Sequence, residues 1–110
     1  MDTGRFVSEI HRSSGLGAVL EEDGDTAYLY MTLGSGKIIS HVFVYPGRSD
    51  KPLTFRWSED GRSVALLVSE RPIAFILDGE AVGYCRSVVE GGPVGSTWDE
   101  AKYDSAFRGI

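Results

Sequence analysis

The chain has 110 residues, of which 42% are apolar and 25% are charged, and its formal net charge is −5. This length fits one domain around a single core, and the acidic balance argues against nucleic acid as a partner, because phosphate binding needs a basic surface. The single cysteine excludes an internal disulfide and favours a reducing, cytoplasmic setting. No apolar run reaches the roughly 18 residues of a membrane helix, so we expect no membrane partner.

The first predicted element is an edge strand over residues 5–10, where apolar and polar residues alternate, and a loop follows over residues 11–15. Beyond this loop, Asp23-Gly24 separates two apolar runs. An Asp-Gly dipeptide in this setting predicts a two-residue β-hairpin, because both turn residues need a positive φ. The same dipeptide recurs as Asp60-Gly61 and Asp78-Gly79, so we expect three such hairpins.

The first hairpin has a self-consistent predicted register. With Asp23-Gly24 as the loop, Leu20 lies opposite Ala27 and Gly17 lies opposite Tyr30. Because side chains alternate between the faces of a strand, this register gathers six apolar residues on one face. They are Leu16, Ala18, Leu20, Ala27, Leu29 and Met31, while Val19, Glu21, Thr26, Tyr28 and Tyr30 point the other way.

A turn at residues 34–36 leads into a predicted strand over 37–45, and a proline-bounded loop follows over 46–52. The second Asp-Gly turn then places Trp57 opposite Val64, again with an apolar face. In the same way, the third turn places Phe75 opposite Val82.

The end of the chain has a helical pattern. Thr97 and Glu100 have the spacing of a capping box, which satisfies the first amides of a helix. Tyr103 and Phe107 then recur at helical spacing, so we expect a short helix near 97–107.

Together these elements predict one β-rich domain over residues 1–110. Its fold class is mostly β, or α+β when the short C-terminal helix is counted. We expect an antiparallel β-meander of about seven or eight strands that closes as an open barrel or a two-layer sandwich.

Two resemblances add to this picture. Residues 55–66, with Trp57-Ser58 before Asp60-Gly61, resemble one hairpin of the propeller repeats that carry a Trp-Ser-x-Asp-Gly turn, but a propeller needs at least four blades and a longer chain. The order of 18–30, Val44-Tyr45 and 57–61 resembles a family of small bacterial proteins catalogued only as a domain of unknown function. That resemblance spans roughly residues 16–100 and implies a bacterial, cytoplasmic, stand-alone domain without an assigned activity.

The sequence predicts no catalytic, cofactor-binding or metal-ligating residue. The acidic run around Asp23 lacks the ligand spacing of a calcium loop, and His11 and His41 lack a third zinc ligand. Residues 34–37 lack the spacing of a phosphate-binding loop. Cys85 fits a small buried apolar side chain better than a nucleophile.

Two functional hypotheses stay open. The favoured one is a non-catalytic protein-interaction module of a bacterial cytoplasm, which binds a basic protein or a second copy of itself, with an immunity-type protein as one version. Its candidate surface combines the first acidic turn with two tyrosines, namely Glu21, Glu22, Asp23, Asp25, Tyr28 and Tyr30. The alternative is a small-molecule-binding β-barrel or weak enzyme with a pocket near Tyr28, Tyr30, Trp57 and His41.

Overall fold

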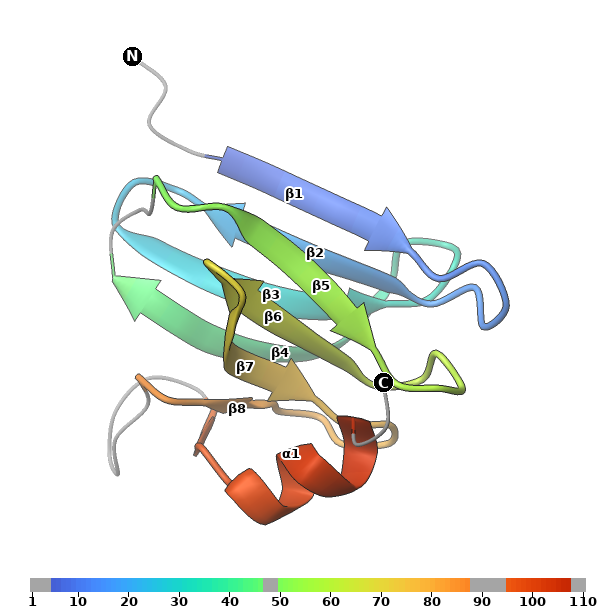
Figure 1. Ribbon diagram of the computed structural model, residues 1–110. Helices are drawn as coiled ribbons and strands as arrows, with labels where there is room; N and C mark the ends of the chain where they lie inside the picture. Colours follow the sequence, from blue (N-terminus) through green and yellow to red (C-terminus); the bar gives the residue numbers. More distant parts are fainter. Residues whose placement is uncertain (1–4, 47–49, 88–94, 108–110) are drawn as a thin grey trace.

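The computed structural model describes residues 5–46, 50–87 and 95–107, which form two β-sheets and one helix (Figure 1). The first sheet contains β1 (Arg5–Ile10), β2 (Gly17–Glu22), β3 (Thr26–Thr32) and β4 (Ile38–Pro46), paired in that order and antiparallel throughout. The second sheet contains β5 (Leu53–Trp57), β6 (Val64–Val68), β7 (Arg71–Ile76), β8 (Tyr84–Cys85) and β9 (Ser96–Thr97), with the last pair parallel.

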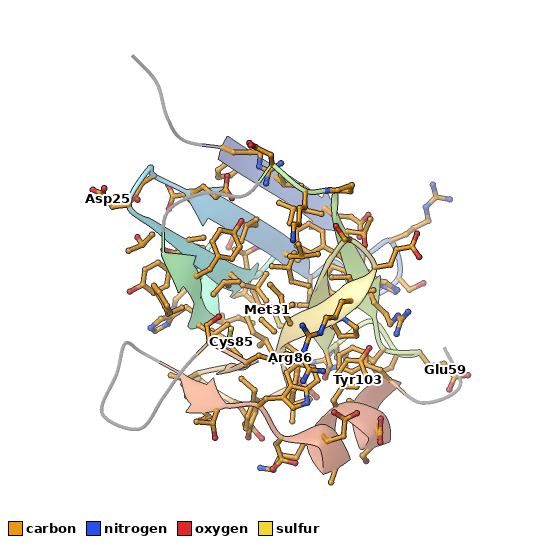
Figure 2. The ribbon with its side chains drawn as sticks, turned by 60° about the vertical axis from the view of Figure 1, so that its left-hand side comes forward. Asp25, Met31, Glu59, Cys85, Arg86 and Tyr103 are labelled. Carbon is orange, nitrogen blue, oxygen red and sulfur yellow. The ribbon has the colours of Figure 1, made fainter. Side chains whose placement is uncertain are left out.

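The two sheets pack face to face, which confirms the mostly β fold and selects the sandwich over the barrel. Alternating residues of β2 and β3 point inward and meet residues of β6 and β7 across the core. Figure 2 shows Met31 and Cys85 within this layer and Asp25 at the far tip of a hairpin. The buried apolar residues of the layer are Leu16, Ala18, Leu20, Ala27, Leu29, Met31, Val42, Val44, Val64, Leu66, Ala74, Ile76 and Cys85.

A third layer covers the outer face of the second sheet. Helix α1 (Glu100–Phe107) lies against this face and buries Tyr103 and Phe107. Strand β6 is therefore buried on both faces, with Val64 facing one core and Ala65 the other. The second core consists of Ala65, Leu67, Phe75, Tyr84, Tyr103 and Phe107.

The helix begins later than the capping box predicts. Thr97 lies in β9, and Asp99 caps the helix instead, because its carboxylate accepts a hydrogen bond from the Lys102 amide at 3.0 Å. The Glu100 carboxylate accepts from the Trp98 indole at 2.8 Å rather than reaching back to Thr97.

The first hairpin has the predicted faces but a different register. Leu20 lies opposite Leu29, and Gly17 lies opposite Thr32 rather than Tyr30. The tip is thus displaced by one residue, to Gly24 and Asp25, and Gly24 alone takes a positive φ. This displacement shifts the partners by two positions, which leaves every side chain on its predicted face.

The other two Asp-Gly turns also differ from two-residue loops. Trp57 does lie opposite Val64 as predicted, but the loop between them runs from Ser58 to Ser63. In the third turn Phe75 lies opposite Tyr84 rather than Val82, again a shift of two. In all three turns the glycine has the positive φ and the aspartate does not.

A further two-residue turn lies where the sequence gives little sign of it. Ser69 and Glu70 join β6 to β7, and both have a positive φ, at 50° and 69°. This is the geometry of a type I′ turn, with residues that rarely adopt it.

The sandwich is joined along one side and open along the other. On the joined side, His41 of β4 donates its amide to Ala81 and accepts a hydrogen bond from the amide of Gly83, at 3.3 and 3.0 Å. On the opposite side, β1 and β5 are the outermost strands of their sheets (Figure 1). Within the described residues, β1 pairs with β2 alone and β5 with β6 alone.

Candidate functional site

The six predicted surface residues separate into three places. Glu21, Tyr28 and Tyr30 lie on the outer face of the first sheet, as their alternation predicts. Asp23 and Asp25 lie exposed at the tip of the first hairpin. Glu22 is a correction, because it points between the sheets and is only 2% exposed.

Glu22 belongs to a buried polar cluster at the rim of the main core. Its carboxylate accepts two hydrogen bonds from the Arg5 guanidinium, at 3.0 and 3.3 Å, and another from the Tyr45 hydroxyl. Burial, together with the bond to Glu22, raises the pKa of Tyr45. Bonding to Glu22 likewise raises the pKa of Arg5. The cluster fastens β1 and β4 to β2, so we assign Glu22 to stability.

An aromatic surface occupies the outer face of the first sheet. Tyr28 stacks on Tyr30 with 6.0 Å between ring centroids and meets the edge of Phe43 at 5.7 Å. Tyr30 also lies beside His41, at 6.5 Å. Burial, with a smaller contribution from Glu21, raises the pKa of Tyr30. We call this surface, made of Val19, Tyr28, Tyr30, His41 and Phe43, the tyrosine face.

A groove runs along the tyrosine face toward the turn between β3 and β4. Its volume is about 300 Å³, and Phe6 and Ile38 on its walls are 66% and 52% exposed. Exposed apolar side chains gathered in this way are typical of a binding surface. The lining residues are Phe6, Val19, Glu21, Tyr30, Thr32, Gly36 and Ile38.

The acids at the hairpin tip have different tasks. The Asp23 carboxylate accepts hydrogen bonds from the amides of Asp25 and Thr26, both at 2.9 Å, and these bonds lower its pKa. Asp23 therefore shapes the turn, as aspartates in such turns commonly do. Glu21 and Asp25 remain as exposed charges beside the tyrosine face. The described residues include no group of three side chains suited to a metal ion.

The structure brings together three of the four residues predicted for the alternative pocket. Tyr28, Tyr30 and His41 share the tyrosine face, but Trp57 packs against the main core near the open side of the sandwich. The Trp57 indole donates to Glu9 at 2.7 Å, and its ring lies 5.3 Å from His11. Trp57 is thus a structural residue that bridges β5 to the first sheet.

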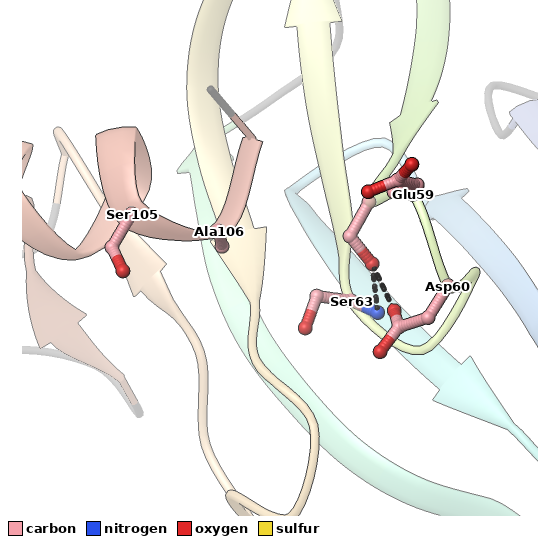
Figure 3. Close-up of a pocket in the computed structure, with 6 residues that line it drawn as sticks. Glu59, Asp60, Ser63, Ser105 and Ala106 are labelled. Atoms are coloured by element: carbon pink, nitrogen blue, oxygen red, sulfur yellow. Dashed lines mark hydrogen bonds between the residues drawn. The ribbon is translucent and has the colours of Figure 1, made fainter. Parts of the chain in front are cut away.

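A second groove, of about 430 Å³, lies between the second Asp-Gly turn and the end of α1 (Figure 3). Its polar groups bond to one another. The Ser58 hydroxyl donates to Asp60 at 2.7 Å and accepts from the Ser63 amide at 3.0 Å. The Ser58 hydroxyl is thus held between the Asp60 carboxylate and the Ser63 amide, and these bonds shape the turn.

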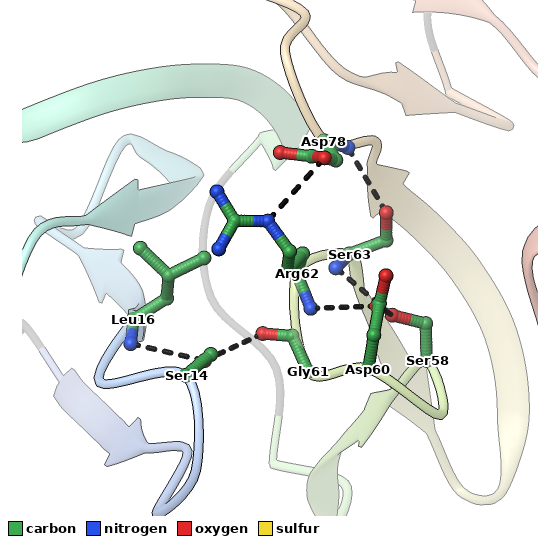
Figure 4. A network of polar contacts seen from close by, with 8 residues as sticks. All are labelled: Ser14, Leu16, Ser58, Asp60, Gly61, Arg62, Ser63 and Asp78. Atoms are coloured by element: carbon green, nitrogen blue, oxygen red, sulfur yellow. Dashed lines mark hydrogen bonds and ion pairs between the residues drawn. The ribbon is translucent and has the colours of Figure 1, made fainter.

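The same turn takes part in a polar network that also includes Ser14, in the loop after β1, and Asp78, in the turn after β7 (Figure 4). Ser14 donates its hydroxyl to the Gly61 carbonyl at 2.7 Å, and the Arg62 guanidinium lies 3.4 Å from the Asp78 carboxylate. Gly61 has a φ of 71°, and a Cβ there would overlap the His11 ring. The Asp-Gly dipeptide thus serves packing here.

Cys85 is fully buried, as predicted for an apolar cysteine. Its thiol donates to the Val44 carbonyl at 3.2 Å and accepts from the Ser87 amide at 3.4 Å. Both contacts fasten β8 to its surroundings.

In the described residues no helix is long and apolar enough to cross a membrane.

Comparison with known proteins gives one match. The model of a family described as "Uncharacterized protein conserved in bacteria (DUF2251)" matches residues 2–107. No match is found among curated proteins or among solved structures. The match extends the sequence resemblance over nearly the whole chain, and its description carries no activity.

Proposed function

The chain belongs to the bacterial family DUF2251, and from its geometry we propose that it is a non-catalytic protein-interaction module that binds a basic protein through the tyrosine face. One observation supports this above all. The outer face of the second sheet is covered by α1, whereas in the described residues no helix lies over the outer face of the first, where Phe43 is buried but Tyr28 and Tyr30 are only half-buried. Tyrosine and phenylalanine are enriched in the centres of protein interfaces.

The charge around the face suggests the kind of partner. Glu21 lines the groove, and Asp25 extends the acidic side at the hairpin tip. The net charge of −5 has the same sign. A partner with basic residues around an apolar centre would therefore be steered toward this surface. An immunity-type protein that neutralises a cationic toxin is one version of this proposal.

The proposed setting is the bacterial cytoplasm. The family description places such chains in bacteria, and the one cysteine is buried as a thiol. Proteins of oxidising compartments more often carry disulfides.

Site-specific photo-crosslinking in the native cell tests the proposal. A photoreactive amino acid replaces Tyr30 in one variant and Glu70 in the control, which lies at an exposed turn of the second sheet. We expect one adduct, formed from position 30 and weakened by salt, whose partner is a basic protein by mass spectrometry. The same adducts from both positions, or none from position 30, would contradict the proposal.

A further inference from the structure

We propose that β1 pairs antiparallel with β1 of a second copy, so that the two first sheets join into one eight-stranded sheet. The outer edge of β1 is the starting observation. In the described residues this six-residue strand pairs with β2 alone, at one edge of the sheet. An unpaired edge presents backbone donors and acceptors that a second strand can meet.

The edge of β1 has few of the features that normally block such pairing. Its pairing with β2 has no bulge, and β1 contains neither lysine nor proline. The edge strands of the second sheet differ, since β5 follows Lys51-Pro52 and β9 has two residues. Short strands, lysine, proline and inward-pointing charges are common protections of edges, and β1 has only the last of these, in Arg5 and Glu9.

Two exposed apolar side chains mark the same edge. Phe6 and Ile10 are 66% and 69% exposed, the highest values among the large apolar residues described. Both point to the outer face, because Val7 between them faces the core. A second strand beside β1 would cover part of both side chains, and burying apolar area favours association.

Symmetry and strand length favour two registers. A two-fold antiparallel pair must place residues of the same face opposite each other, so the axis passes through a residue, and the overlap of two six-residue strands is longest when that residue is Val7 or Ser8. An axis at Ser8 would set Val7 opposite the partner's Glu9. An axis at Val7 instead sets Arg5 opposite the partner's Glu9, twice, and opposite charges across strands attract.

We infer the register centred on Val7. The Arg5 guanidinium keeps its bonds to Glu22 in this register, and its positive charge attracts the second carboxylate placed opposite it. Glu9 is exposed, and the Trp57 indole bonds to one of its two oxygens, Oε1. Phe6 then lies opposite the partner's Ser8 and diagonal to the partner's Ile10.

The dimer goes beyond the proposed function, because it forms without any other protein. Its two-fold axis runs perpendicular to the joined sheet, so both tyrosine faces point to the same side. A partner with two copies of the basic surface would bind such a pair with a gain in avidity.

Disulfide trapping tests the register in the full chain. Val7→Cys brings the two new thiols together at the proposed axis, whereas Ser8→Cys does so only in the alternative register. We expect mild oxidation to trap a covalent dimer of Val7→Cys and little of Ser8→Cys, with the parent chain and its buried Cys85 as background. Trapping of Ser8→Cys alone, or of neither variant, would overturn the inference.

Sedimentation equilibrium of the purified protein tests the contact itself. Glu9→Arg places like charges opposite each other at both ends of the strand pair, so we expect its dimer dissociation constant to rise about tenfold. Glu59→Arg makes the same charge change at an exposed turn and should leave the constant unchanged. Thermal unfolding of Glu9→Arg controls for the lost bond to Trp57.

A monomeric parent chain throughout the concentration series, or an equal effect of both substitutions, would contradict the dimer. Neither result touches the proposed function, because the crosslink from position 30 is measured independently. In turn, loss of that crosslink with an intact dimer would leave the inference standing.

Discussion

The outer faces of the two sheets carry similar side chains but differ in what covers them. On the second sheet, Phe75 stacks on Tyr84 at 4.7 Å and meets Tyr103 and Phe107 of α1 at 5.7 and 6.2 Å. On the first sheet, Tyr28, Tyr30 and Phe43 make a comparable ring cluster with no helix over it in the described residues.

This difference separates two uses of aromatic residues in one small domain. Where α1 covers the rings, they form a second core and contribute to stability. Where no helix covers the rings, they contribute less to stability, and we propose that they provide contact area for a partner. The burial of a ring, rather than its presence in a strand, indicates which use applies.

The largest effect is expected at the covered face. Phe75→Ala removes a fully buried ring that contacts α1 and β8 at once, so the free energy of unfolding should fall by about 3–5 kcal/mol. Urea denaturation followed by circular dichroism measures the change. A loss below about 1 kcal/mol would mean that α1 is not a firmly packed layer.

Two adjacent acids sharpen the contrast between the inside and outside of the first sheet. Glu22→Gln leaves the Arg5 guanidinium beside a neutral group, and we expect a loss of about 1–3 kcal/mol in unfolding free energy. Arg5 is one-third exposed, so water limits this loss. Glu21→Gln makes the same change on the outer face and should stay within about 0.5 kcal/mol. Equal effects would contradict the assignment of Glu22 to stability.

A smaller effect on stability is expected at the uncovered face. Tyr30→Ala removes one ring of a half-buried stack, so its cost should be about 1 kcal/mol by the same urea measurement. Its effect on binding should be larger. When the photoreactive amino acid is placed at position 28 instead of 30, we expect Tyr30→Ala to reduce the crosslink to the partner at least about tenfold. A loss of stability as large as that of Phe75→Ala would show that this face is part of the core.

The faces of the strands were predictable from the sequence because alternation has a period of two. Leu20 and Leu29 share the buried face in the predicted register and in the observed one, since a shift of two residues preserves the face. The shift itself was not predictable from Asp-Gly alone. In the structure the Asp23 carboxylate holds the turn through hydrogen bonds and only Gly24 has a positive φ.

Other features depend on long-range contacts that a local pattern does not contain. Ser69 and Glu70 adopt left-handed conformations because β6 and β7 are both held by packing, which outweighs their turn preference. Tyr45 reaches the inner face because of a bulge between the pairings of Ala27 and Tyr28, so the alternation that holds from His41 to Phe43 does not place it.

The misplacement of Glu22 has a clearer origin. Alternation already puts this acid on the same face as Leu20, so its burial was a readable consequence of the predicted register. The sequence could not identify its partners, because Arg5 and Tyr45 come from β1 and β4. When alternation places an acid on a buried face, we expect it to be paired with polar groups from neighbouring strands.

Tyr45 gives the prediction with the smallest expected effect, which tests the buried polar cluster of Arg5, Glu22 and Tyr45. Burial and the bond to Glu22 raise the pKa of Tyr45 above its ordinary value of about 10, so the folded state holds this proton more tightly than the unfolded state. The stability from Tyr45 is therefore complete below about pH 10 and is lost as the pH rises toward the raised value.

Tyr45→Phe removes this ionisation, and its unfolding free energy should fall less steeply than that of the parent chain above about pH 10. The pKa values of Tyr30 and Lys102 are also raised, so their stabilisation is likewise lost as the pH rises, equally in both proteins, and the difference between the two curves isolates Tyr45. One proton limits that difference in slope to about 1.4 kcal/mol per pH unit. Parallel curves would show that Tyr45 ionises in the folded chain as it does in the unfolded chain. The cluster around Glu22 would then be as accessible to water as the outer face of the first sheet.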